Sequence, residues 1–81
     1  MSNLKLEIVS PEKIIFQGEI NLVEVPGKRG RFTLLRGHAP IISSLNKGDI
    51  RVQDMSGNEQ VFSCDKGYLE CENNRVTILM N

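Results

Sequence analysis

Apolar and polar residues alternate with a period of two along much of the chain. Leu4, Leu6 and Ile8 alternate with Lys5 and Glu7, and the same pattern recurs at 50–52 and 75–80. Because successive side chains of a β-strand point to opposite faces, this period predicts strands with one buried and one wet face. No stretch has a convincing helical period, so the chain is expected to be all-β.

Turn-forming residues separate these runs at short intervals. They are Ser10-Pro11, Pro26-Gly27, Asn46-Lys47-Gly48, Ser56-Gly57-Asn58 and Asn73-Asn74. Many short strands with frequent turns indicate a sandwich or a barrel. The apolar pattern changes phase between Ile14 and Val25. Gly18 lies inside this run, and it is a candidate for a bulge or bend where one strand passes between sheets.

The length of 81 residues predicts a single domain, residues 1–81. The expected core consists of alternating apolar residues, namely Leu6, Ile8, Phe16, Val52, Val76 and Ile78. A domain of this size has little core to hollow into an active-site cavity. The chain is therefore expected to be a binding or structural module rather than an enzyme. We expect no signal peptide, because the first residues lack a basic segment followed by an apolar stretch, and no apolar run is long enough for a membrane span.

Few residues suggest chemistry. Cys64 and Cys71 do not form a metal-binding pair and are expected to be free thiols, one or both in the core. His38 is the only histidine, so a zinc site is not expected. We expect His38 to hydrogen-bond backbone within its own turn, and no serine is marked as its catalytic partner.

One segment is unevenly charged. Between Val25 and Pro40 lie four basic residues and no acid, although ten basic and ten acidic residues balance over the whole chain; the four are Lys28, Arg29, Arg31 and Arg36. This loop is either a solvated tip or a patch that faces an acidic protein, lipid head groups or nucleic acid. Gly27 and Gly30 resemble the backbone clamp of KH domains, but strands flank them, so hairpin glycines are expected and nucleic-acid binding is not.

The order of several motifs resembles the epsilon subunit of rotary ATP synthases over essentially the whole chain. The matching segments are Leu6 to Glu12 with Phe16-Gln17-Gly18, Val23 to Gly27, Leu34 to Ile42 with its GHAP turn, Gly67 to Cys71, and Asn74 to Leu79. The resemblance implies a flattened antiparallel β-sandwich of about eight to ten short strands. It also implies a non-catalytic, cofactor-free rotor subunit of the central stalk, which couples the gamma subunit to the membrane ring of c subunits during ion-driven ATP synthesis.

The resemblance assigns two interfaces. Ser10 and the turn of Gly37, His38, Ala39, Pro40, Ile41 and Ile42 would face gamma, whereas Lys28, Arg29, Gly30 and Arg31 would face the polar loops of the ring. In relatives this ring-facing loop is usually neutral or acidic. The complex would lie at the cytoplasmic face of a bacterial inner membrane, where this subunit would be peripheral.

Many relatives continue beyond the position of Asn81 into a helical hairpin, which is absent from this sequence. That hairpin is the part that can inhibit ATP hydrolysis or bind ATP, so we expect neither function of these residues. An alternative function is a free-standing β-sandwich adaptor that binds an acidic protein or membrane surface through residues 28–36.

Overall fold

The computed structural model describes residues 3–81. These residues form eight β-strands, and the described part of the chain contains no helix that could cross a membrane. The strands are β1 (Leu4–Val9), β2 (Ile14–Gly27), β3 (Gly30–Leu35), β4 (Ile41–Leu45), β5 (Gly48–Asp54), β6 (Glu59–Cys64), β7 (Gly67–Glu72) and β8 (Arg75–Met80).

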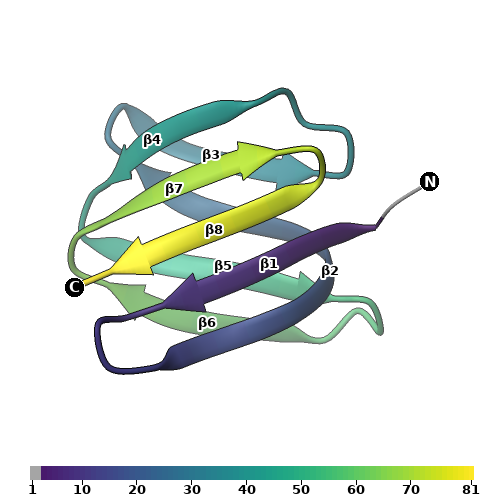
Figure 1. Cartoon of the computed structure of the whole chain (residues 1–81), viewed down its shortest axis with the longest axis horizontal. Coiled ribbons are helices and arrows are strands. Elements are labelled where there is room, and N and C mark those ends of the chain that lie inside the picture. The colour runs from purple at the N-terminus through teal and green to yellow at the C-terminus, as the bar shows by residue number, and fades with distance from the viewer. Residues whose placement is uncertain (1–2) are drawn as a thin grey trace.

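The strands lie in two layers that share β2 (Figure 1). One layer runs β4-β7-β8-β1 and ends on the first half of β2; the other runs β3, the second half of β2, β5 and β6. The predicted all-β sandwich is therefore confirmed. Its strands pair antiparallel with one exception among the described pairs, because β1 lies parallel to β8 with Val9 opposite Leu79.

Strand β2 crosses from one layer to the other through a bulge. Its first half pairs with β1 and its second half with β5, and the register with β5 shifts between Ile20 and Leu22. Ile20 and Val23 are both buried although three positions separate them, which an uninterrupted alternation does not permit. The predicted change of phase is correct, but the predicted bulge at Gly18 is wrong, because Gly18 pairs in regular register with Leu6.

The core fills the space between the layers. Five of the six predicted core residues are at most 2% exposed, and they are Leu6, Ile8, Val52, Val76 and Ile78. Phe16 is only half-buried and packs edge-on against Phe62 at the margin of the core, with ring centroids 5.8 Å apart. Cys64 and Cys71 are buried free thiols, as predicted, and burial raises the pKa of both.

Candidate interaction surfaces

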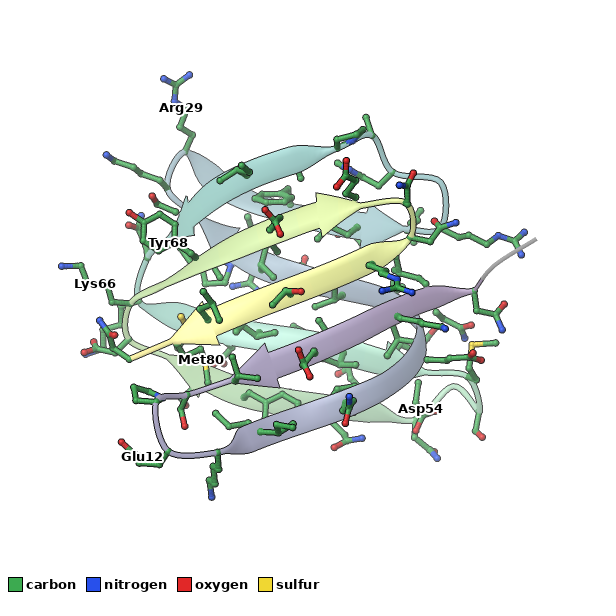
Figure 2. The ribbon with its side chains drawn as sticks, in the orientation of Figure 1. Glu12, Arg29, Asp54, Lys66, Tyr68 and Met80 are labelled. Carbon is green, nitrogen blue, oxygen red and sulfur yellow. The ribbon has the colours of Figure 1, made fainter. Side chains whose placement is uncertain are left out.

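The basic loop is the tip of the β2–β3 hairpin. Gly27 pairs with Gly30, so Lys28 and Arg29 form a two-residue turn, and the predicted hairpin glycines are confirmed. The left-handed φ of 131° at Gly30 favours glycine there. Arg29 projects away from the body of the protein (Figure 2). Within residues 3–81, neither Lys28 nor Arg29 forms an ion pair.

Arg31 differs from the two residues at the tip. Its Nη2 lies 3.1 Å from Oε1 of Glu24 and donates a 2.8 Å hydrogen bond to the carbonyl oxygen of Asp49. Although the segment between Val25 and Pro40 contains no acid, Arg31 is therefore paired with an acid that lies just outside it. Sequence spacing hid the pair, because Glu24 lies on the neighbouring strand, near Arg31 only once the hairpin has formed. Arg31 braces the hairpin against β2 and β5.

This pair begins a line of alternating charges on the outer face of the β3-β2-β5-β6 layer. Glu24 also lies 3.9 Å from Arg51, and Arg51 lies 2.6 Å from Glu59. The members of this charge ladder are Arg31, Glu24, Arg51 and Glu59, one from each strand of the layer. Each is more than a third exposed, so each pair contributes only ~0–1 kcal/mol. The ladder gives this face a polar, self-paired surface.

The turn between β3 and β4 is held by backbone contacts and by a second turn. Gly37 has a φ of 85°, and its N–H donates a 2.7 Å hydrogen bond to Oδ1 of Asn74. The N–H of His38 donates to the carbonyl oxygen of Leu35 at 3.1 Å. Nδ1 of His38 lies 2.7 Å from the carbonyl oxygen of Ala39, so this nitrogen carries a proton and donates. The predicted backbone role of His38 is confirmed.

Ser10 serves the turn that joins β1 to β2. Its N–H donates to the carbonyl oxygen of Lys13 at 2.9 Å, and its Oγ lies 3.3 Å from both the N and the O of Lys13. These contacts close the turn locally.

The residues predicted to face gamma do not form one cluster. Val9 pairs with Leu79, Leu79 with Tyr68, and Tyr68 with Ser44 near the end of β4. Ser10 therefore lies at the end of the layer where β4 finishes, whereas residues 37–40 precede the start of β4. The β1–β2 and β3–β4 turns consequently lie at opposite ends of the sandwich (Figure 1).

A row of apolar side chains bridges much of this separation. Ile42, Tyr68 and Leu79 are 74%, 60% and 52% exposed on the outer face of the β4-β7-β8-β1 layer. Half-buried Val9 lies beside Leu79 on β1. We call these four residues the apolar stripe. The sequence assigns Ile42 to the predicted gamma interface but does not single out Tyr68 or Leu79. Their signal was an apolar residue at the wet position of an alternating strand.

The stripe reaches the hairpin at one end. A hollow of about 470 Å³ lies between them, lined by Lys28, Asn46, Lys66, Tyr68, Leu79 and Met80 among others. Figure 2 shows Lys66 and Tyr68 at this end of the sandwich, below Arg29. The apolar stripe and the basic tip are thus neighbouring parts of one continuous surface.

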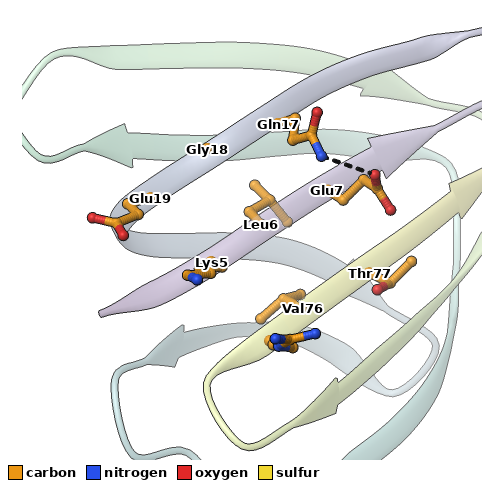
Figure 3. Close-up of a pocket in the computed structure, with 9 residues that line it drawn as sticks. Lys5, Leu6, Glu7, Gln17, Gly18, Glu19, Val76 and Thr77 are labelled. Atoms are coloured by element: carbon orange, nitrogen blue, oxygen red, sulfur yellow. Dashed lines mark hydrogen bonds between the residues drawn. The ribbon is translucent and has the colours of Figure 1, made fainter. Parts of the chain in front are cut away.

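Another hollow, of about 510 Å³, lies on the outer side of β2, β1 and β8 (Figure 3). Its rim is polar, with Lys5, Glu7, Gln17, Glu19, Arg75 and Thr77, and the backbone of Gly18 also lines it. Gln17 donates a 3.3 Å hydrogen bond to Glu7 within it. These are cross-strand neighbours on a wet sheet face, and no nucleophile and base are paired there. Within residues 3–81, no cluster of three or more ligating side chains could hold a metal ion.

Comparison with known proteins decides the family. Residues 3–81 match the family described as "ATP synthase, Delta/Epsilon chain, beta-sandwich domain". The ATP synthase epsilon chain of Chlorobaculum tepidum is 39% identical over 74 residues, which make up 91% of this chain and 84% of that relative. This chain belongs to the ATP synthase epsilon family.

The share of the relative's length that this chain covers varies from one epsilon chain to another. The epsilon chain of Campylobacter fetus subsp. fetus is 35% identical over all 81 residues, which cover 63% of it. The same fold occurs in a solved structure. A chain in a cryo-EM structure of the Euglena gracilis mitochondrial ATP synthase (OSCP/F1/c-ring) superposes with a TM-score of 0.92 at 17% identity, covering 99% of this chain and 51% of that one.

Proposed function

We propose that this chain is a rotor subunit of a rotary ATP synthase, placed in the central stalk between the gamma subunit and the ring of c subunits. It takes no part in the chemistry of ATP synthesis and transmits rotation between its two partners. The match to the epsilon family over residues 3–81 carries this proposal. In a bacterium the subunit would lie at the cytoplasmic face of the inner membrane, held there through the complex.

The gamma subunit is the proposed partner of the apolar stripe and the elements at its two ends. Ser10 adjoins Val9, and Ile41 and Ile42 continue from the Gly37–Pro40 turn. Covering Ile42, Tyr68 and Leu79 removes apolar surface from water, which favours association at about 25 cal/mol per Å². The hydrogen bond from Gly37 to Asn74 supports a fixed conformation for the turn before it meets a partner.

The ring of c subunits is the proposed partner of the hairpin tip. Lys28 and Arg29 are exposed and lack ion pairs within residues 3–81, so both are available to acidic side chains or carbonyl oxygens of the ring loops. Arginine can bind a carboxylate at two points, which supplies register as well as attraction. Gly30 shapes the turn, and Arg31 braces the hairpin through Glu24 and Asp49.

Co-purification from the native host tests this function. A tagged chain should retain gamma and the catalytic head. Replacing Tyr68 and Leu79 together by aspartate should weaken gamma binding by about tenfold or more, because two charges would enter an apolar contact. Val61→Asp is the matched control: Val61 is 51% exposed on β6, in the layer that lacks the stripe.

Thermal unfolding of each variant separates lost binding from lost folding. If the folded double variant retained gamma as well as the Val61→Asp control does, the apolar stripe would not be the gamma interface. If the unmodified chain retained neither gamma nor the head, the rotor function itself would be rejected. Capture of an acidic surface through residues 28–36 would then favour the adaptor.

A further inference from the structure

Among residues 3–81, one edge of strand β4 is unpaired except near its end. The strand pairs with β7 along Ile41–Leu45, but on its other side it contacts β2 in strand pairing only at Gly27 and Leu45. The carbonyl oxygen of Ser44 accepts from Lys28 N–H at 3.1 Å on that second side. Because the backbone groups of alternate residues point the same way, the N–H and C=O of Ile42 also point away from β7. They lie beyond the last bond to the hairpin.

A groove runs beside this edge. Its volume is about 490 Å³, and its walls come from β4 and the β2–β3 hairpin. The hairpin contributes residues 27–32 and β4 contributes 41–44. Three of the lining residues are basic and none is acidic, and they are Lys28, Arg29 and Arg31. Arg31 is already paired with Glu24, so Lys28 and Arg29 carry the uncompensated charge at the end of the groove near Ser44.

We propose that β4 is a β-augmentation site for an extended, acidic segment of a partner protein. The segment would add as a further strand beside β4 and hydrogen-bond to the N–H and C=O of Ile42 and to the N–H of Ser44. Acidic side chains at one end of it would meet Lys28 and Arg29. An acidic segment complements the charge of the groove, whereas a basic or neutral one would give Lys28 and Arg29 no ion-pair partner.

This inference goes beyond the rotor function and does not depend on it. Its test uses the chain alone with a synthetic probe: an extended peptide of about six residues with alternating valine and threonine and glutamates at one end. The matched probe carries lysines in place of the glutamates. We expect the acidic probe to bind and to slow hydrogen exchange at the amides of Ile42 and Ser44 by about tenfold or more. The lysine probe should not do so.

Two variants separate the backbone contribution from the side-chain contribution. Ile42→Pro removes the N–H that points to the open edge but leaves the bonds to β7, because proline is tolerated where its missing N–H faces solvent. Ile42→Ala also removes the isoleucine side chain but keeps that N–H. The proline variant should bind the acidic probe about tenfold or more weakly than the alanine variant. Lys28→Glu with Arg29→Glu should also weaken binding, and more so at low salt.

Equal binding of the two probes by the unmodified chain would overturn the proposal, as would equal affinity of the folded proline and alanine variants for the acidic probe. If the proline variant does not fold, the exchange measurement on the unmodified chain decides. Protection centred on amides other than those of β4 would reject the site. Because no ATP synthase subunit enters this assay, its failure would leave the co-purification result untouched.

Discussion

Oδ1 of Asn74 accepts a 2.7 Å hydrogen bond from the N–H of Gly37, which joins two turns that lie 37 residues apart in the sequence. Both residues have left-handed backbones, with φ of 60° at Asn74 and 85° at Gly37. Asparagine accepts this conformation better than most residues, and its short side chain then reaches the neighbouring turn. The conformation of the β3–β4 turn thus depends on the β7–β8 turn.

Asn74→Gly should loosen the β3–β4 turn without disturbing the β7–β8 turn. Glycine keeps the left-handed conformation but removes the acceptor for Gly37. We expect a loss of about 0.5–1.5 kcal/mol in the free energy of unfolding and faster hydrogen exchange at the Gly37 amide. Asn73→Gly is the matched control, since Asn73 has a φ of 51°. A slow Gly37 amide in Asn74→Gly would show that the contact does not hold the turn.

Ile78→Ala should cost about 2–5 kcal/mol, because its side chain is fully buried between the layers. Leu79→Ala on the same strand is the control. Its side chain is 52% exposed, so the change should cost far less. Chemical denaturation of both variants measures the difference. Similar losses in the two variants would mean that the facing of β8 is wrong.

Lys28→Glu with Arg29→Glu should leave the free energy of unfolding within about 0.5 kcal/mol, since both side chains lie at an exposed tip. It should weaken attachment to the membrane sector, and the contact of the unmodified chain should loosen as salt rises. Arg31→Glu is expected to behave differently. It would place a second carboxylate beside Glu24 and so reduce stability as well. Sedimentation of membranes with bound head, at several salt concentrations, checks the first change.

The buried thiols predict a loss of stability at alkaline pH. Burial raises the pKa of Cys64, with a smaller contribution from Asp65, and burial also raises the pKa of Cys71. The unfolded chain therefore loses thiol protons first as pH rises. Their contribution is complete below the unfolded pKa and is lost as pH rises toward the folded pKa. Denaturation at about pH 7 and about pH 10 should show a smaller decline for the Cys64→Ala, Cys71→Ala variant than for the unmodified chain.

The sequence predicts well those features that depend on the residues of a single strand. The alternation at Leu6 and Ile8 predicts their burial, because neighbouring side chains must face opposite ways. It does not predict which strands pair or which side chains come into contact across strands. Nothing local distinguishes the parallel pairing of β1 with β8 or brings Glu24 to Arg31. The presence of glycine, which permits bends, predicts a bulge at Gly18, yet the register shift lies after Ile20.

The two candidate interaction surfaces also differ in how well the sequence predicts them. The hairpin tip is local, and its glycines were predictable. The apolar stripe is not local, because it exists only after β4, β7, β8 and β1 align Ile42, Tyr68, Leu79 and Val9. Apolar residues at the wet positions of two separate strands gave a weak signal, and only the sheet order shows that they adjoin.

Strand β2 has a mechanical consequence. Its backbone is hydrogen-bonded to β1 in one layer and to β3 and β5 in the other. Sliding one layer over the other would therefore have to break these ladders or stretch covalent bonds. A torque applied at the hairpin tip is transmitted through β2, which is hydrogen-bonded to strands of both layers. The domain should turn as a stiff block, so that little of an applied rotation is lost as internal shear.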